Sequence, residues 1–318
     1  MTHNKISLYI SVPLLISLST SSLANVLEDD QAQSLHSAGT EFFLSDDSED
    51  FQTYKLSAEF LPQYESADDY LGMRASAYQY KADDWRRDGQ KISFIAREID
   101  SATADGWFVD TGIFTQDDHT LFTFDGSYRT PLAKKTALEV FANRDWVETQ
   151  SALNAGTNFT FVGAALDQGL GEHVTVVGVA GSQFFSDDNR RDHGRMKLIY
   201  QPSLDLGLTF QARYRTYHST EEDVGRRYFN PKDYEESMLA LGWRQPFAGW
   251  TTGLTAGFGR ETINDDPSQG TRLFELNLQS PVHGSQFIRM NAGYSRSASF
   301  YGPDYNYRYI RGEWIISF

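Results

Sequence analysis

The sequence predicts an all-β fold, a closed transmembrane antiparallel β-barrel of about 16 strands with both termini on the periplasmic side. Three observations support this prediction. Apolar and polar residues alternate with a period of two over most of the chain after residue 37. Apart from the N-terminal segment, no stretch approaches the roughly 20 consecutive apolar residues of a membrane-spanning helix. This excludes a helical membrane protein. Short proline-containing connections alternate with longer charged ones.

The alternating segments each have about the 9–11 residues that a tilted membrane strand requires. Leu208 and Phe210 face one way, for example, while Thr209 and Gln211 face the other. A half-buried sheet in a soluble protein would show the same period, so the number and length of the segments decide between the two. The segments are expected to begin near Gly39, Gln52, Tyr70, Lys91, Trp107, Thr120, Thr136, Asn154, Val174, Arg195, Leu206, Glu235, Thr251, Arg272, Gln286 and Tyr305.

The connections alternate in character, in phase with the strands. Counted back from Phe318, every second connection is short, and four of these begin with a polar residue followed by Pro, which presets φ for a turn and ends strand pairing. Short turns on one rim and longer loops on the other are typical of outer-membrane barrels. The four Pro turns are residues 130–134, 201–205, 245–249 and 280–284, and the charged connections include 46–50, 83–88, 187–192, 219–233 and 264–267.

Aromatic residues are unusually abundant, with 22 Phe, 17 Tyr and 6 Trp among 318 residues. Barrels place such residues in two girdles at the membrane interfaces. The mean hydropathy of −0.48 suits a water-filled barrel, because only alternate residues meet lipid. The chain has no Cys, which excludes a disulfide framework, a thiol nucleophile and a thiolate metal site.

The formal net charge is −15 at pH 7. Such acidity argues against nucleic acid as a partner, because phosphate binding needs clustered Lys and Arg. It suits a surface or lumen that meets cations, either divalent ions or a partly cationic polymer.

The first residues have the pattern of a secretory signal peptide. Lys5 supplies the positive charge, a largely apolar run covers residues 6–18, and Ser22-Leu23-Ala24 offers small residues for cleavage. A retained anchor is the alternative, but the run is short and rich in serine. We therefore expect a signal peptide at residues 1–24, a short periplasmic lead at 25–37 and the barrel at 38–318.

A sheet in hydrocarbon must close, since an open edge would leave backbone groups without partners. About 16 strands enclose an aqueous lumen, and the charged residues on the inward side carry both signs. They either line a path for a hydrated cargo or pair across the interior and partly plug it. The candidate lumen-lining residues are Arg213, Arg215, Glu236, Arg244, Glu275, Arg289, Arg311 and Glu313.

In the closing segment, residues 310–318, Trp314, Ile316 and Phe318 face one way. This segment resembles the last strand of Gram-negative outer-membrane barrels, in which a terminal Phe after alternating apolar residues is read by the barrel-assembly machinery. The resemblance implies that Trp314, Ile316 and Phe318 form an assembly signal and that the protein resides in the outer membrane.

One long loop contains the run from Gly225 to Tyr234, and another connection reads Phe-Phe-Ser-Asp-Asp-Asn over residues 184–189. These elements resemble the barrel portion of bacterial exopolysaccharide export porins of the cellulose and poly-N-acetylglucosamine secretion type. The family has a Tyr-Phe-(Ser/Asn)-Pro element followed by Tyr, and a Phe-Ser-Asp-Gly-Asn-like loop in which Asp188 here replaces the Gly. The matching residues are Tyr228, Phe229, Asn230, Pro231 and Tyr234, with Ser186, Asp187 and Asn189.

The resemblance implies a passive conduit for an exported polysaccharide. In that family the barrel follows a long array of tetratricopeptide repeats, and this sequence contains no 34-residue repeat, so a separate periplasmic repeat protein would have to supply the scaffold. Sugars stack on aromatic rings while charged groups bind their hydroxyls. The candidate polymer contacts are Arg226, Arg227, Tyr228, Phe229 and Tyr234; the alternative is that the rings pack the loop and the arginines pair with Glu221, Glu222 and Asp223.

Other chemistry has little support in the sequence. The acidic loops lack the spacing of a calcium site, so solvated loops that meet lipopolysaccharide are favoured over a metal site. The histidines are scattered, and no nucleophile elbow or His-Glu-x-x-His motif occurs. We therefore expect no enzymatic activity and no cofactor. A general small-solute diffusion porin, a plugged structural or receptor barrel and a barrel enzyme are the alternatives to the polysaccharide conduit.

Overall fold

The computed structural model describes residues 35–203, 205–282, 284–297 and 305–318. The predicted signal peptide and most of the predicted lead lie outside these residues. The strands are β1 (Leu35–Asp47), β2 (Phe51–Ser66), β3 (Asp69–Ala82), β4 (Trp85–Ile99), β5 (Gly106–Gln116), β6 (His119–Ala133), β7 (Thr136–Trp146), β8 (Asn158–Gly169), β9 (Val174–Phe185), β10 (Arg190–Tyr200), β11 (Leu208–Ser219), β12 (Asp233–Phe247), β13 (Trp250–Ile263), β14 (Gln269–Gln279), β15 (Gln286–Ser297) and β16 (Tyr305–Ser317), with a short helix α1 (Gln150–Ala155).

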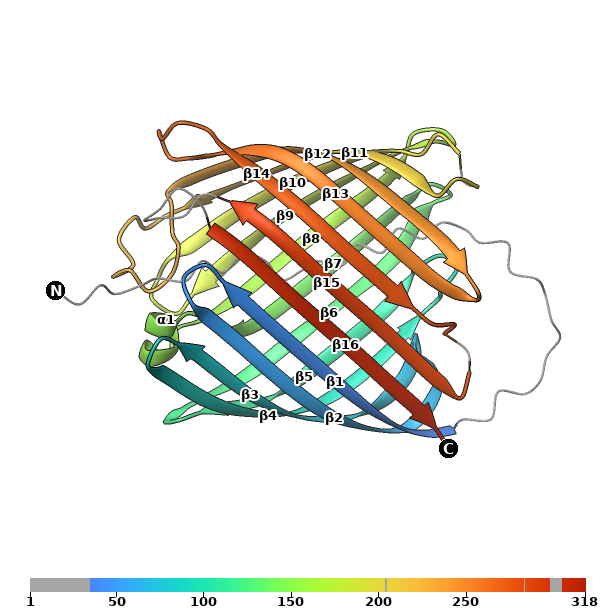
Figure 1. Cartoon of the computed structure of the whole chain (residues 1–318), viewed down its shortest axis with the longest axis horizontal. Helices are drawn as coiled ribbons and strands as arrows, with labels where there is room; N and C mark the ends of the chain where they lie inside the picture. The colour runs from blue at the N-terminus through green and yellow to red at the C-terminus, as the bar shows by residue number, and fades with distance from the viewer. Residues whose placement is uncertain (1–34, 204, 283, 298–304) are drawn as a thin grey trace.

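The 16 strands form one closed barrel (Figure 1). Each strand pairs antiparallel with its sequence neighbours, and β16 closes the ring on β1. The predicted fold class and strand number are confirmed. The beginning of β1 and the end of β16 lie at the same rim, the right-hand one in Figure 1, and α1 lies at the other.

The strand starts agree with the predicted ones within a few residues. The largest differences are at β4 and β10, which begin at Trp85 and Arg190 rather than near Lys91 and Arg195. The sequence predicts loops for the charged residues at these positions, but they continue the pairing ladder because the strands extend past the apolar zone into water. Arg86 and Asp88 on β4, for example, point outward and form an ion pair at 3.0 Å.

The helix α1 was not predicted, because β8 was expected to start near Asn154. Thr149 caps its N-terminus by accepting a hydrogen bond from the Ala152 backbone, and Gly156 ends it in the left-handed conformation with φ of 65°. No helix of the described residues is long and apolar enough to cross a membrane.

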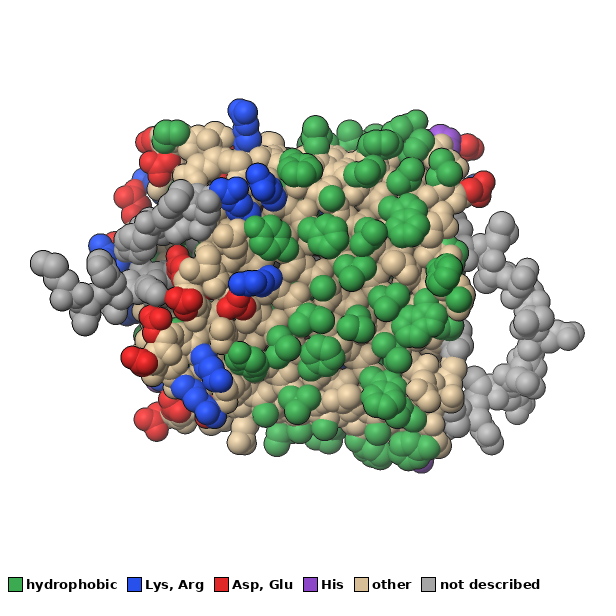
Figure 2. Space-filling model, viewed as in Figure 1, with side chains coloured by type: hydrophobic (Ala, Val, Ile, Leu, Met, Phe, Trp, Pro, Cys, Tyr) green, Lys and Arg blue, Asp and Glu red, His purple; other side chains and the backbone are tan. Residues whose placement is uncertain are grey.

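The outer face carries a broad apolar band, which Figure 2 shows as hydrophobic side chains between the acidic loop rim and the opposite rim. Alternation along each strand creates this band. On β2, Leu56 and Phe60 point outward and are more than half exposed, while Ser57 and Glu59 point inward and are buried. Such an exterior is stable only in contact with lipid, so the strands span a membrane.

Candidate functional site: the lumen and the loops at its mouth

The inner wall contains a dense group of ion pairs around Glu41 of β1. The Glu41 carboxylate lies 2.6 Å from the Nζ atom of Lys55 on β2 and 2.6 Å from a guanidinium nitrogen of Arg311 on β16. Arg74 of β3 is 3.8 Å away. The carboxylate is 1 % exposed, so three cations on three different strands surround one buried anion.

Arg74 extends this group to β5. Its guanidinium lies 2.7 Å from Glu59 and 2.7 Å from Asp110, and Lys91 of β4 lies 2.9 Å from the other oxygen of Asp110. We call the seven residues the seam network. It comprises Glu41, Lys55, Glu59, Arg74, Lys91, Asp110 and Arg311, which are four cations and three carboxylates.

A second group of ion pairs lies nearer the rim that holds the start of β1 and the end of β16. Arg289 of β15 is 3.3 Å from Glu313 of β16 and 4.0 Å from Asp68. Arg97 of β4 lies 3.3 Å from the same Asp68 oxygen. Asp68, in the β2–β3 turn, thereby connects side chains from both sides of the β1–β16 closure.

Arg215 is the centre of a third group, on β11 to β13. It lies 2.8 Å from Glu236 and donates to the Tyr234 hydroxyl at 2.7 Å. That hydroxyl donates to Glu261 at 2.6 Å. Arg213, one inward position along β11, lies 3.8 Å from Glu275.

All eight predicted lumen residues lie on strands at inward positions of the alternation. Seven of them belong to the three ion-pair groups. The eighth, Arg244, lies near the end of β12, where it follows the outward-facing Trp243 and so takes an inward position. Sequence reasoning omitted Glu41, Lys55 and Lys91. The alternation of β1 and β2 contained the signal for the first two, because Glu41 and Lys55 are in phase with the buried Ser37 and Ser57.

Residues 147–157, the β7–β8 loop, carry α1 against the inner wall at the barrel mouth. The hydroxyl of Tyr80 on β3 donates to Glu148 at 3.2 Å, and Arg87 of β4 donates to the Leu153 carbonyl at 2.8 Å. Leu153 is fully buried. Its cluster is Phe51, Tyr80, Ala82, Phe114, Leu121, Trp146 and Leu153, contributed by β2, β3, β5, β6, β7 and α1.

Residues 220–232, the β11–β12 loop, contact the first loop directly, because the Thr149 hydroxyl donates to the Arg227 carbonyl. The Tyr228 ring stacks on Phe185 at 4.5 Å between centroids, and Phe229 packs with Tyr305 of β16. The two loops therefore form a connected series of contacts that joins the β3–β4 side of the mouth to the β16 side.

The structure buries the three predicted aromatic contacts, Tyr228 and Phe229 within the loop and Tyr234 on the inner wall at the start of β12. Tyr228, Phe229 and Tyr234 are 5 %, 4 % and 1 % exposed, so no ring face is available to a sugar in this conformation. Arg226 is exposed, and Arg227 lies 3.5 Å from Asp187. The carboxylates expected to pair with the arginines have other contacts. Glu222 pairs with Lys232, and Asp223 accepts from the Gly225 backbone.

The polar side chains of the Phe-Ser-Asp-like connection hold the long loop in place. Asn189 donates to the Tyr228 hydroxyl at 3.1 Å and to Asn230 at 2.9 Å, and Tyr228 donates to Asp187 at 3.0 Å. The two elements that carried the family resemblance are thus in direct contact. Burial raises the pKa of Tyr228, so the hydroxyl stays protonated as a donor.

Glu148, in the first loop, has an unusual environment for a carboxyl group. Burial and the negative charge of Asp145 raise its pKa from the usual 4.5 to about 8. The Glu148 carboxyl group is therefore largely protonated at neutral pH.

Among the described residues, no cluster of three or more His, Asp and Glu side chains has the arrangement of a metal site.

No protein-family model and no curated protein matches this sequence. The fold is similar to solved outer-membrane barrels. A structure described as a bacterial polysaccharide outer membrane secretin matches with a TM-score of 0.65 and 13 % identity, covering 90 % of this chain and 99 % of that chain. OprD of Pseudomonas aeruginosa has a TM-score of 0.45 and 10 % identity, covering 92 % and 99 %. CdiB of Acinetobacter baumannii has 0.43 and 11 %, covering 91 % and 61 %. The first similarity shows a shared barrel fold.

Proposed function

We propose that this protein is an outer-membrane channel that serves as a passive conduit for an exported polysaccharide. In this proposal residues 1–24 are removed on export, both termini face the periplasm, and the loops that contain α1 face outward. The apolar exterior supports the membrane placement.

Trp314, Ile316 and Phe318 are proposed to guide assembly. Phe318→Ala should lower the yield of assembled barrel in cells and leave the stability of refolded barrel unchanged; equal yields would exclude that role.

The observation that carries the conduit proposal is the charged lining of a barrel as wide as 16 strands. Ion pairs run along the inner wall, so the lining is polar while most of its charges are neutralised locally. A hydrated polymer can exchange hydrogen bonds with such a wall without being held by a strong net charge. The similar polysaccharide secretin, whose barrel is matched over nearly its whole length, supports the same class of cargo.

The charge distribution refines the expected cargo. The acidic excess of the chain lies largely in its connections, such as residues 46–50 and 264–267, whereas the inward carboxylates are mostly paired. A preference for a partly cationic polymer would therefore act at the mouth rather than along the lumen. A separate periplasmic repeat protein is proposed to deliver the polymer to the opposite rim.

Conductance of the purified protein in planar bilayers tests the proposal. We expect an open channel with cation preference that is blocked by partly deacetylated poly-N-acetylglucosamine and much less by neutral dextran of equal size. Arg213→Gln together with Glu236→Gln should change the conductance, because both side chains line the lumen, and Arg86→Gln, on the outer face, should not. An electrically silent bilayer, or equal block by both polymers, would refute the conduit and leave the plugged barrel as the better interpretation.

A general small-solute diffusion porin is the second candidate. The observation that favours it is the 147–157 loop, which folds inside the mouth as the constriction loop of a diffusion porin would. Swelling of liposomes in small sugars separates the two functions. Rapid swelling without block by polymer supports the diffusion porin, whereas polymer block with slow swelling supports the conduit.

A further inference from the structure

The outer face of β13 to β16 carries four arginines on the loop side of the apolar band. Alternation places Arg260, Arg272, Arg296 and Arg308 outward, one on each strand. Figure 2 shows this gathering of cationic side chains between the apolar band and the acidic rim. The next outward positions toward the opposite rim are apolar, and they are Phe258, Phe274, Tyr294 and Ile310.

The register brings two of these arginines directly opposite each other. Arg272 of β14 and Arg296 of β15 are cross-strand partners. Like charges in such a pair repel each other and destabilise the sheet. An anion bound beside Arg272 would accept charge-assisted hydrogen bonds from its guanidinium and offset this repulsion. Among the described residues, no carboxylate lies within ion-pair distance of Arg260 or Arg272.

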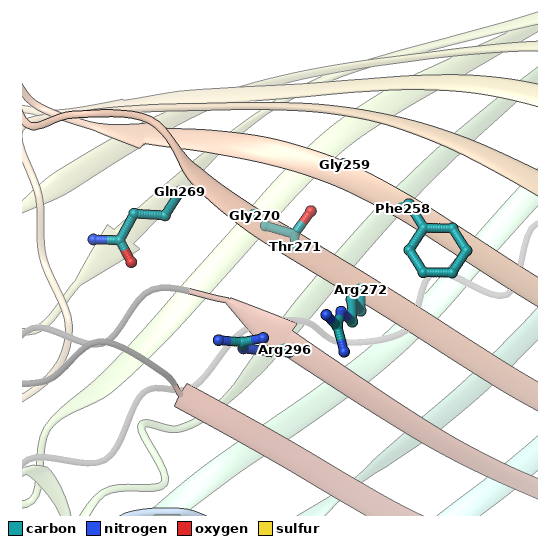
Figure 3. Close-up of a pocket in the computed structure, with 7 residues that line it drawn as sticks. All are labelled: Phe258, Gly259, Gln269, Gly270, Thr271, Arg272 and Arg296. Carbon is teal, nitrogen blue, oxygen red and sulfur yellow. The ribbon is translucent and has the colours of Figure 1, made fainter.

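A surface groove lies at the same place (Figure 3). It has a volume of about 480 Å³ and is lined by Phe258, Gln269, Gly270, Arg272 and Arg296, among others. Gly270 points outward opposite Arg260 and leaves open space where a side chain would stand. The missing side chain therefore makes room between the guanidinium groups.

A second groove continues the first one over the apolar band. It has a volume of about 550 Å³ and shares Phe258 and Gly259 with the basic groove. Its outward side chains are mainly apolar and include Met196, Leu198 and Leu239. A ligand that fills both grooves needs an anionic head at the loop side and hydrocarbon chains at the membrane side.

We propose that these two grooves form a binding site for a phosphorylated glycolipid of the outer leaflet, the lipid A part of lipopolysaccharide. Arg272 and Arg296 bind a phosphate group, Arg260 and Arg308 complete the cationic surroundings, and an acyl chain lies against Phe258 and Leu239. Arg308 also forms an ion pair with Asp46 of β1 at 2.8 Å. The inference rests on the proposed outward position of the loops, since lipid A occupies the outer leaflet.

Native mass spectrometry and thermal unfolding of the full barrel in detergent test this site, with bisphosphorylated lipid A as the probe. We expect one tightly bound lipid A whose affinity falls with added salt. Arg272→Gln with Arg296→Gln should weaken binding at least about tenfold, the effect of losing one charge-assisted contact or more. Gly270→Glu should weaken it comparably by placing a carboxylate in the groove.

Arg86→Gln is the control, because Arg86 is exposed on the outer face of β4, a strand that lines neither groove. It should bind lipid A as the unsubstituted protein does. Dephosphorylated lipid A and inorganic phosphate separate the sources of affinity, since each offers only half of the ligand. The proposal would be overturned if dephosphorylated lipid A bound as tightly as bisphosphorylated lipid A. It would also be overturned if inorganic phosphate alone raised the unfolding temperature as much as lipid A does, or if the Arg272 and Arg296 variant bound lipid A as the unsubstituted protein does.

Channel measurements keep this result distinct from the conduit proposal. The Arg272 and Arg296 variant should retain the conductance and polymer block of the unsubstituted barrel, since both side chains lie outside the lumen. Retained conductance with unchanged lipid A binding would refute only the lipid site. A silent channel that still binds lipid A through the arginines would refute only the conduit.

Discussion

Glu41→Gln removes the central anion of the seam network while nearly preserving its shape. At 2.6 Å and an effective dielectric constant of about 20, each of the pairs with Lys55 and Arg311 has a Coulomb energy of roughly 6 kcal/mol. Desolvation of the three ions offsets much of this energy, and loss of one partner from a buried pair costs about 3–5 kcal/mol. We therefore expect the unfolding free energy to fall by about 3–5 kcal/mol.

Urea unfolding of the refolded barrel, followed by tryptophan fluorescence and by mobility in gels, measures this change. Glu65→Gln is the control, because that carboxylate is exposed at the end of β2, and it should change stability by less than about 0.5 kcal/mol. In Glu41→Gln with Lys55→Met one uncompensated cation is also removed, so part of the stability should return. A Glu41→Gln barrel as stable as Glu65→Gln would refute the view that the network is desolvated and show that lumen water screens it.

Three further predictions have definite expected outcomes. Gly72→Ala should destabilise the barrel by about 1–3 kcal/mol, because its Cβ would lie 2.2 Å from the Phe60 carbonyl oxygen. Gly178→Ala, whose Cβ meets open space, should be neutral in the same urea titration, and equal effects would contradict this reasoning. Leu153→Asp should release the 147–157 loop from the inner wall and raise single-channel conductance; an unchanged conductance would show that the loop does not narrow the path. Glu148 binds its proton more tightly in the folded loop than in the unfolded chain, so docking of the loop should be strongest below about pH 4.5 and weaken up to about pH 8. Protease protection of the loop measured from pH 4 to 9 should show this loss, and Glu148→Gln should abolish the pH dependence; a pH profile that persists in Glu148→Gln would assign it to another group.

The sequence was sufficient for the strands because two local patterns agree in phase. Side-chain alternation marks which residues belong to a strand, and Pro turns such as that at Pro202, between β10 and β11, mark where one rim lies. Two of the four predicted Pro turns are wrong in detail, because Pro131 and Pro246 lie on β6 and β12 and still pair with Ala137 and Thr251. Each pattern depends on residues that are near one another in the chain. The strand number and most of the boundaries follow from these patterns, and so does the inward position of residues such as Arg215 and Glu275.

The mouth could not be predicted in the same way, because its contacts are distant in sequence. The hydrogen bond between Tyr80 and Glu148 joins residues 68 positions apart, and the contact between Thr149 and Arg227 joins residues 78 positions apart. Six helical residues have no hydrophobic periodicity long enough to detect. The burial of Tyr228 follows only from where these loops meet.

The position of the seam network is explained by how the barrel closes. Every neighbouring pair of strands except β1 and β16 is joined by a connection, so the last pair must find its register over almost the entire chain. Three side-chain contacts fix the register across this boundary. Glu41 pairs with Arg311, Asp46 pairs with Arg308, and Asp47 accepts from the Tyr305 hydroxyl at 3.2 Å.

These contacts distinguish the correct register from a shifted one. Slippage of β16 by one residue would turn Arg311 from the lumen to lipid and leave Glu41 buried without it. Slippage by two residues would keep the faces but move the guanidinium by about 7 Å along the strand, beyond reach of the carboxylate. The buried charges at the seam therefore act mainly on register. Glu41→Gln should accordingly populate barrels that are open or mispaired at β1 and β16, detectable as increased hydrogen exchange on these two strands while exchange on β9 remains unchanged.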